Sequence, residues 1–218
     1  KQLIAAGMNV ARLNFSHGTH EDHARTMTLI RQAAAEMGKT VSILLDTKGP
    51  EIRPGLLEAG EVELIQGQPF ILTADEVVGN AERVSISYPG LVNELRPGDT
   101  VLLDDGLIGL EVREIRGQDI HCVVKNSGRL RDRKGVNVPG VSIGLPGITE
   151  KDAADIRFGV EQGVDFIAAS FVRKPADILE IHRILDEMHA DIPVIAKIEN
   201  REGVENLDAI LEVADGLM

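Results

Sequence analysis

The sequence predicts an α/β fold: a partial (β/α)8 TIM barrel that is interrupted by an inserted all-β barrel domain. Strand-like apolar runs near residues 8, 41, 165 and 194 alternate with segments of helical period, which is typical of parallel strands joined by helices. Polar residues follow each of these runs, which favours a barrel over an open doubly wound sheet. From residue 54 to residue 145, short β-rich runs and turn residues replace the helical period.

The composition excludes several classes of protein. A net charge of −12 argues against nucleic acid or an anionic membrane as the main partner, and no apolar run approaches the length of a membrane span. The single cysteine, Cys122, lies in an alternating apolar run, so we expect a buried side chain in a cytoplasmic protein without disulfides. No signal peptide is visible. Because the first residue is Lys1 and not Met, and residues 1–6 look like the end of a helix that stops at Gly7, we expect the chain to begin inside a longer protein.

The first segment of the chain predicts a strand, a helix and a second strand. Residues 8–15 are apolar at first and polar at the end, so they predict a strand with a polar carboxyl end. Residues 19–37 place apolar side chains at helical spacing. The continuous apolar run 41–45 predicts a strand that is buried on both faces.

The middle segment predicts a small all-β barrel or sandwich. Its strands are expected over residues 62–65, 70–73, 84–87, 100–103, 107–115 and 120–125. Residues 126–144 are polar and glycine-rich, so we expect a mobile return to the α/β part. The pair Asp104 and Asp105 before Gly106 favours a surface hairpin turn over a metal site.

The α/β pattern resumes after the middle segment. Thr149 and Asp152 have the spacing of a capping box, which predicts the start of a helix. In the last helix we expect Val204, Leu207 and Leu211 to face the core. The further elements are a strand over 165–172, a helix that begins at Pro175, a strand over 194–200, a helix over 202–213 and the start of another strand at Leu217.

Two charged residues close the apolar strand over 194–200. Strand alternation puts Lys197 and Glu199 on one face, and burying either charge alone would cost several kcal/mol. One interpretation is an ion pair that caps a core strand. The other is a site at the carboxyl end of a strand, in which the lysine meets an anion and the glutamate meets a metal ion.

Polar side chains also gather at the ends of the first two strands. Arg12 is suited to hold a phosphate through a bidentate contact. The neutral oxygens of Asn14 and Ser16 suit a hard cation, and Asp46 and Thr47 would add two more oxygens. The alternative interpretation is an ordinary polar rim of the barrel.

Other charged groups have both a plain and a functional interpretation. Glu51 and Arg53 follow a Gly-Pro turn, where a solvated linker is the plain interpretation and a hinge is the functional one. Four basic residues stand out in this acidic chain and form either a solvated loop or a phosphate clamp on a mobile lid. They are Arg129, Arg131, Arg133 and Lys134.

Five strings of sequence, taken together, resemble pyruvate kinase of the bacterial type, and they come in that family's order and at its spacing. They are ARLNFSHG (11–18), LLDTKGPEIR (44–53), RKGVNVPG (133–140), LPGITEKD (145–152) and IAKIEN (195–200). The resemblance implies a barrel (A) domain over 1–53 and 146–218, with an inserted β-barrel (B, lid) domain over 54–145. It also implies an internal fragment of a glycolytic enzyme that transfers phosphoryl from phosphoenolpyruvate to ADP, giving pyruvate and ATP.

The resemblance also implies a role for each matching residue. Arg12 and Lys197 would bind the substrate and act in catalysis, with Lys197 stabilising charge in the transition state. Glu199 would ligate Mg²⁺ or Mn²⁺, and Glu51 occupies the position that sets K⁺ dependence. The K⁺ ligands would be Asn14, Ser16, Asp46 and Thr47. The nucleotide contacts would be Asn14, Ser16, His17, Arg53 and Lys134.

Assembly and rival functions complete the expectations. The resemblance implies a homotetramer with no nucleic-acid or membrane partner. A metal-dependent barrel lyase or aldolase that acts on a pyruvate enolate would need a similar lysine and carboxylate, but it would leave the inserted domain unexplained. A non-catalytic domain is the second rival.

Overall fold

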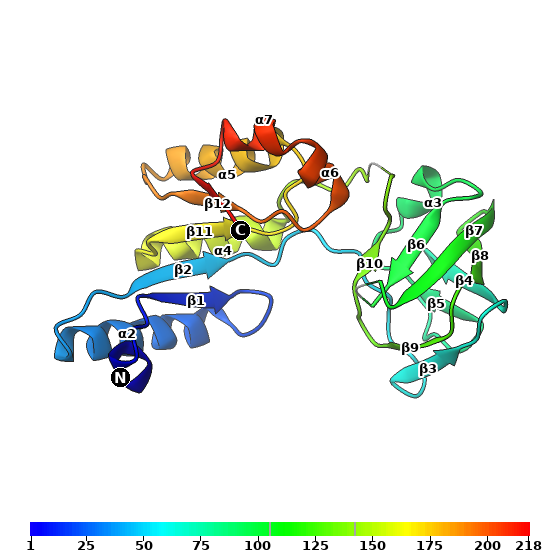
Figure 1. The fold of residues 1–218 in the computed structure, drawn as a ribbon, viewed down its shortest axis with the longest axis horizontal. Coiled ribbons are helices and arrows are strands. Elements are labelled where there is room, and N and C mark those ends of the chain that lie inside the picture. Colours follow the sequence, from blue (N-terminus) through cyan, green and yellow to red (C-terminus); the bar gives the residue numbers. More distant parts are fainter. Residues whose placement is uncertain (105, 142) are drawn as a thin grey trace. The chain divides into compact units, whose positions relative to one another are not determined.

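The computed structural model describes residues 1–104, 106–141 and 143–218, which divide into two units (Figure 1). Unit 1 comprises Lys1–Pro50 and Pro146–Met218, and unit 2 comprises Glu51–Leu145.

The first boundary lies between Pro50 and Glu51, earlier than the expected position after Arg53. The difference has a structural cause, because the chain joins the backbone pairing of unit 2 before residue 54. Ile52 forms a β-bridge with Val136 of that unit.

Unit 1 contains a parallel sheet whose strands follow one another in chain order, β1-β2-β11-β12-β13. Figure 1 shows these strands side by side in a curled sheet, and the α/β class is confirmed. The strands are β1 (Val10–Asn14), β2 (Ser42–Asp46), β11 (Phe166–Ala169), β12 (Val194–Ala196) and β13 (Gly216–Leu217). The helices are α1 (Gln2–Ala5), α2 (His20–Glu36), α4 (Glu150–Gln162), α5 (Pro175–Glu187), α6 (Arg201–Glu205) and α7 (Leu207–Leu211).

Local sequence explains where these helices begin and end. Thr149 and Asp152 form the expected capping box, in which each side chain accepts a hydrogen bond from the other residue's backbone N–H. Helix α4 ends at Gly163, whose left-handed conformation suits a glycine. Pro175 occupies the first turn of α5, where its missing N–H costs nothing.

The core of unit 1 is built from the buried faces of the strands and helices. Strand β2 is buried on both faces, as its continuous apolar run predicts. The largest contributions come from apolar side chains that include Phe15, Met27, Ile43, Leu45, Ile156, Ile167, Ile178 and Ile181.

The prediction for the last helix is wrong in two respects. The helix is divided at Asn206 into α6 and α7, and Val204 and Leu211, which we expected to face the core, are 61% and 47% exposed. The buried residues are Gly203 and Ile210. A Cβ atom at Gly203 would lie 2.5 Å from the carbonyl oxygen of Val172, so the close approach of a glycine sets the inward face.

Unit 2 contains a six-stranded sheet, in the order β10-β6-β7-β8-β4-β5, and a two-stranded sheet of β3 and β9. Its strands are β3 (Glu61–Leu64), β4 (Pro69–Thr73), β5 (Arg83–Ser85), β6 (Thr100–Leu103), β7 (Ile108–Arg116), β8 (Asp119–Val124), β9 (Gly128–Arg131) and β10 (Val136–Asn137). A short helix, α3 (Leu91–Glu94), was not expected. A separate core that includes Phe70, Leu72, Val101, Leu110 and Ile120 holds this unit together.

Residues 126–144, for which we expected a mobile return, contain β9 and β10, and Ser142 lies outside the described residues. Strand β9 pairs with β3, and Val136 of β10 pairs with Leu103 of β6. Only Leu130 within β9 is fully buried, so the segment lacks the apolar alternation that marks a strand.

Two smaller predictions concern unit 2. Cys122 is buried in β8, as expected, and burial raises the pKa of its thiol to about 12, so it is not a nucleophile at neutral pH. The backbone N–H of Leu107 donates to the carbonyl of Asp104 at 3.0 Å between the paired strands β6 and β7, which is the expected hairpin. Asp105 lies outside the described residues.

Candidate functional site

A buried carboxylate at the end of β2 joins two of the predicted cations. Asp46 is 1% exposed. Its Oδ2 atom lies 2.6 Å from Arg12 Nε, and its Oδ1 atom lies 3.0 Å from Lys197 Nζ. Because burying a charge without a partner is costly, these two contacts account for the burial of Asp46. The carboxyl ends of β1, β2 and β12 thus meet at one group, as parallel strands require.

Ser170 completes this group, although the sequence analysis did not select it. It follows β11 and is buried. Its Oγ atom accepts a hydrogen bond from Lys197 Nζ at 2.8 Å and lies 2.6 Å from the carbonyl oxygen of Thr47 and 3.2 Å from Asp46 Oδ1. A hydroxyl has one hydrogen, so the shorter contact to Thr47 is the main one. The backbone N–H of Ser170 also donates to Thr47 Oγ1 at 3.0 Å.

Lys197 and Glu199 lie just beyond the end of β12 and not within it. The Lys197 side chain is 11% exposed, and its Nζ atom is 3.4 Å from Glu199 Oε1. The other Glu199 oxygen accepts the backbone N–H of Phe171 at 2.9 Å. Phe171 has a φ of +57°, which is uncommon for a residue with a large side chain. The Glu199 side chain remains 34% exposed, and both interpretations of the pair, a cap on a core strand and a binding site, stay open.

The end of β1 and the loop after it carry three predicted site residues. Asn14 is paired in register with Asp46, but its Oδ1 atom accepts the backbone N–H of Ser16 at 2.9 Å. Among the described residues, no hydrogen bond joins the Asn14 or Ser16 side chain to Asp46 or Thr47. The His17 side chain is exposed.

Unit 2 carries the remaining predicted residues, Glu51, Arg53 and Lys134, and both basic side chains have an acidic partner there. Arg53 Nε lies 2.7 Å from Glu51 Oε2, and Lys134 Nζ lies 3.1 Å from Asp104 Oδ1. Both basic side chains are about a third exposed, at 33% and 37%. Their acidic partners are less exposed, at 17% for Glu51 and 10% for Asp104.

Two arginines of the basic group lie on strand β9 and not in a loop. Arg129 NH1 lies 3.2 Å from Glu61 Oε1, and Arg131 Nε lies 3.6 Å from Glu61 Oε2. This pairing follows from the register of β3 with β9, so these two side chains have a structural explanation.

A family model for the barrel domain of pyruvate kinase matches residues 1–218. The chain belongs to the pyruvate kinase family. It is 60% identical over 220 residues to a pyruvate kinase of Bacillus licheniformis, 57% to that of Geobacillus stearothermophilus and 54% to that of Staphylococcus aureus strain MRSA252. Each alignment covers all of this chain, which spans 38% of the length of these relatives. The resemblance drawn from the five strings is confirmed.

The donor atoms suit the cations that the family resemblance implies. Among the described residues, no group of three or more His, Cys, Asp or Glu side chains is placed to hold a metal ion. Mg²⁺, however, is commonly held by one or two carboxylates together with substrate oxygens, and Glu199 offers a partly exposed carboxylate. The oxygens of Asn14, Ser16, Asp46 and Thr47 are hard donors that suit K⁺.

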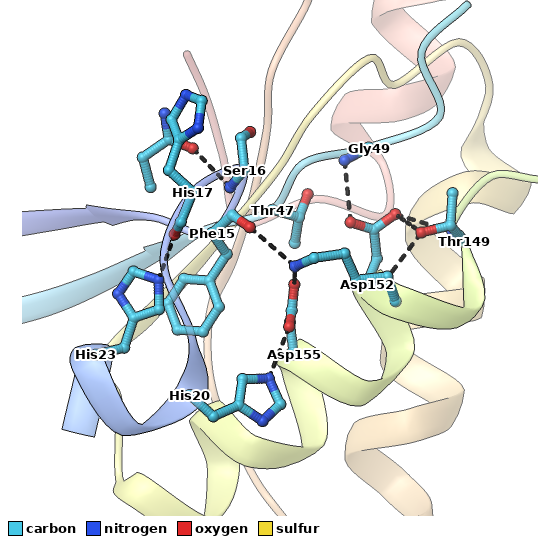
Figure 2. A network of polar contacts seen from close by, with 12 residues as sticks. Phe15, Ser16, His17, His20, His23, Thr47, Gly49, Thr149, Asp152 and Asp155 are labelled. Carbon is cyan, nitrogen blue, oxygen red and sulfur yellow. Dashed lines mark hydrogen bonds and ion pairs between the residues drawn. The ribbon is translucent and has the colours of Figure 1, made fainter. Parts of the chain in front are cut away.

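Gly49 is required where the chain leaves β2 and passes Ser170. It has a φ of +71°, and a Cβ atom there would lie 2.8 Å from Ser170 Cβ and 2.9 Å from Ser170 O. Its N–H donates to Asp152 Oδ1 at 3.0 Å, as Figure 2 shows. The position of Ser170, and through it that of Lys197, therefore depends on a residue without a side chain.

Replacing Gly49 by Ala should lower the free energy of unfolding by about 3 kcal/mol, because the strained backbone and the contact with Ser170 both cost energy. Gly38→Ala is the matched control, since Gly38 has a φ of +59° but no atom within 4 Å of the added Cβ. It should cost about 1 kcal/mol. Urea denaturation of both variants measures the difference, and equal losses would contradict the role of the Ser170 contact.

Among the described residues, no helix combines the length and apolar character that crossing a bilayer requires.

Proposed function

We propose that this chain forms part of the active site of a pyruvate kinase, which transfers the phosphoryl group of phosphoenolpyruvate to ADP and yields pyruvate and ATP. The observation that carries the proposal is the convergence of Arg12 and Lys197 on Asp46 at the carboxyl ends of parallel strands. In this proposal the parallel sheet belongs to a (β/α)8 barrel, and unit 2 is the domain inserted into it.

The chemistry needs positive charge more than it needs a base. The bond between phosphorus and the enol oxygen breaks, a bond to a β-phosphate oxygen of ADP forms, and the enolate takes a proton at carbon to become pyruvate. Arg12 would bind the phosphate through its guanidinium. Lys197 would stabilise the charge that develops on the phosphoryl group and the enolate oxygen. Asp46 and Ser170 hold the Lys197 amino group in place for this task.

Glu199 would hold Mg²⁺ or Mn²⁺, and Asn14, Ser16, Asp46 and Thr47 would hold K⁺. When bound, these ions supply further positive charge to the phosphate oxygens. Glu199 is partly exposed, and among the K⁺ ligands Asp46 and Thr47 are buried whereas Asn14 is exposed.

The proposed contacts of ADP are the five residues that the resemblance implies. Asn14 is the last residue of β1, Ser16 and His17 lie in the loop after it, and Arg53 and Lys134 belong to unit 2. Arg53 and Lys134 would exchange their acidic partners for phosphate oxygens. A cytoplasmic homotetramer acting in glycolysis completes the proposal.

The test measures pyruvate formation from phosphoenolpyruvate by the full-length protein, with and without ADP. We expect pyruvate to form only with ADP, and one ATP to appear for each pyruvate. Turnover of a pyruvate enolate without ADP would favour a lyase or aldolase. A folded full-length protein with no turnover would favour a non-catalytic domain.

K⁺ dependence should follow the charge at residue 51. Glu51→Lys places a cation in this position, so the rate without K⁺ should rise about tenfold, equivalent to about 1.4 kcal/mol of charge stabilisation. Initial rates with K⁺ or with tetramethylammonium measure the effect. Glu51→Gln is the control, because it removes the ion pair with Arg53 without adding a cation. An unchanged K⁺ requirement in Glu51→Lys would remove Glu51 from the proposal.

A further inference from the structure

The loop that follows β1, residues 15–18, is held by side chains that lie outside the predicted site. The backbone N–H of Phe15 donates to the carbonyl of Asp46 at 2.9 Å. The carbonyl oxygen of the same residue, Phe15, accepts a hydrogen bond from Lys151 Nζ of α4, also at 2.9 Å. The His17 carbonyl lies 2.9 Å from His23 Nε2 of α2, as Figure 2 shows. Two carbonyls of this short loop are therefore fixed by side chains from two helices.

A buried carboxylate fixes Lys151 in turn. Lys151 Nζ lies 2.6 Å from Asp155 Oδ2, one helical turn along α4. The other oxygen of Asp155 lies 2.8 Å from His20 Nε2 on α2. Asp155 is 1% exposed, whereas the Lys151 side chain is 48% exposed. The buried carboxylate therefore orients the Lys151 amino group towards Phe15.

Ring contacts complete the support of the loop. The buried ring of Phe15 stacks on His23, with centroids 3.9 Å apart and planes 12° apart. The His20 ring stacks on Phe158 of α4, with centroids 4.2 Å apart and planes 11° apart. Figure 2 shows the ring of Phe15 between the backbone of the loop and these helices. The Phe15 side chain and carbonyl are thus both restrained, so the position of the next residue, Ser16, is restrained as well.

We propose that Lys151 is a positioning residue, which acts through the Phe15 carbonyl to hold the loop that presents Ser16 and His17. The inference rests on the proposed function, in which those two residues face the monovalent cation and the nucleotide. Arg12 and Lys197, by contrast, are held by Asp46. Losing Lys151 should therefore weaken the use of K⁺ and ADP more than that of phosphoenolpyruvate.

The experiment compares Lys151→Met with Arg157→Met in the full-length protein. Both variants remove one positive charge from α4, but Arg157 pairs with Glu187 at 2.8 Å on the exposed side of the helix. In Lys151→Met the half-saturating concentration of K⁺ or ADP should rise about tenfold. This is the typical effect of losing one hydrogen bond from a charged donor. That of phosphoenolpyruvate should stay within about twofold. Arg157→Met should change none of them.

Amide hydrogen exchange gives a second readout that needs no turnover. The backbone N–H groups of residues 15–18 should exchange about tenfold faster in Lys151→Met than in Arg157→Met. Unchanged exchange together with an unchanged K⁺ and ADP requirement would overturn the inference. If the unsubstituted protein shows no ADP-dependent turnover, the proposed function fails, and the exchange measurement still decides whether Lys151 holds the loop.

A second variant covers the case in which Lys151→Met does not fold. His23→Phe keeps an aromatic ring to stack on Phe15 and removes the contact with the His17 carbonyl. The same selective rise in half-saturating K⁺ or ADP, with faster exchange at residues 15–18, is expected. A folded His23→Phe protein that matches the unsubstituted protein in both measurements would overturn the inference.

Discussion

Replacing Lys197 by Met should lower the kcat of the full-length enzyme by about two to three orders of magnitude, with a smaller change in the half-saturating concentration of phosphoenolpyruvate. The Lys197 amino group is held by oxygens of Asp46, Ser170 and Glu199. It is therefore oriented before the substrate arrives. A group that is aimed at charge in the transition state contributes to kcat more than to binding. Methionine keeps most of the length of the side chain and removes the charge.

A matched control separates the loss of this amino group from a general loss of charge. Lys39 is exposed in the turn between α2 and β2, and Lys39→Met should leave both kinetic constants within about twofold of the unsubstituted enzyme. Steady-state rates with phosphoenolpyruvate and ADP varied in turn provide the comparison. A Lys197→Met enzyme with a nearly normal kcat would remove Lys197 from the catalytic role.

The convergence of Arg12, Asp46 and Lys197 was predictable because parallel strands in chain order bring their carboxyl ends to one edge of a sheet. The same rule should have selected Ser170. It did not, because phenylalanine and valine after Ser170 predict that the strand continues to residue 172. The chain instead turns at Phe171, whose positive φ ends the strand at Ala169. Local β propensity does not predict the turn at Phe171.

Two other features escaped the sequence analysis for a related reason. The Gly-Arg-Leu-Arg sequence of β9 has one buried residue, Leu130, and it becomes a strand because β3, more than 60 residues earlier, pairs with it. The inward face of α6 is set by Gly203. Because glycine has no apolar side chain, it does not contribute to the hydrophobic periodicity from which a buried helix face is predicted. Local patterns predict elements that bury apolar side chains, and they miss elements that are fixed by distant partners.

Asp46→Asn should lower the free energy of unfolding by about 2–3 kcal/mol when no ligand is present. The amide keeps the shape of the side chain, but Arg12 and Lys197 lose the negative charge between them. The loss stays below that of a fully buried pair, because the Arg12 side chain is 54% exposed and is partly solvated. Lys197 also retains Glu199 at 3.4 Å.

The same substitution should change the response to substrate in the opposite direction. Two cations without Asp46 attract an anion more strongly, so added phosphoenolpyruvate should stabilise Asp46→Asn more than the unsubstituted protein in urea denaturation without K⁺. Asp165→Asn is the control at the opposite end of the sheet, where Asp165 accepts the backbone N–H of Ile43 at 2.7 Å and an amide oxygen still can. Its cost should be below about 1 kcal/mol. Equal losses in the two variants, or equal stabilisation of Asp46→Asn and the unsubstituted protein by phosphoenolpyruvate, would show that Asp46 does not neutralise Arg12 and Lys197.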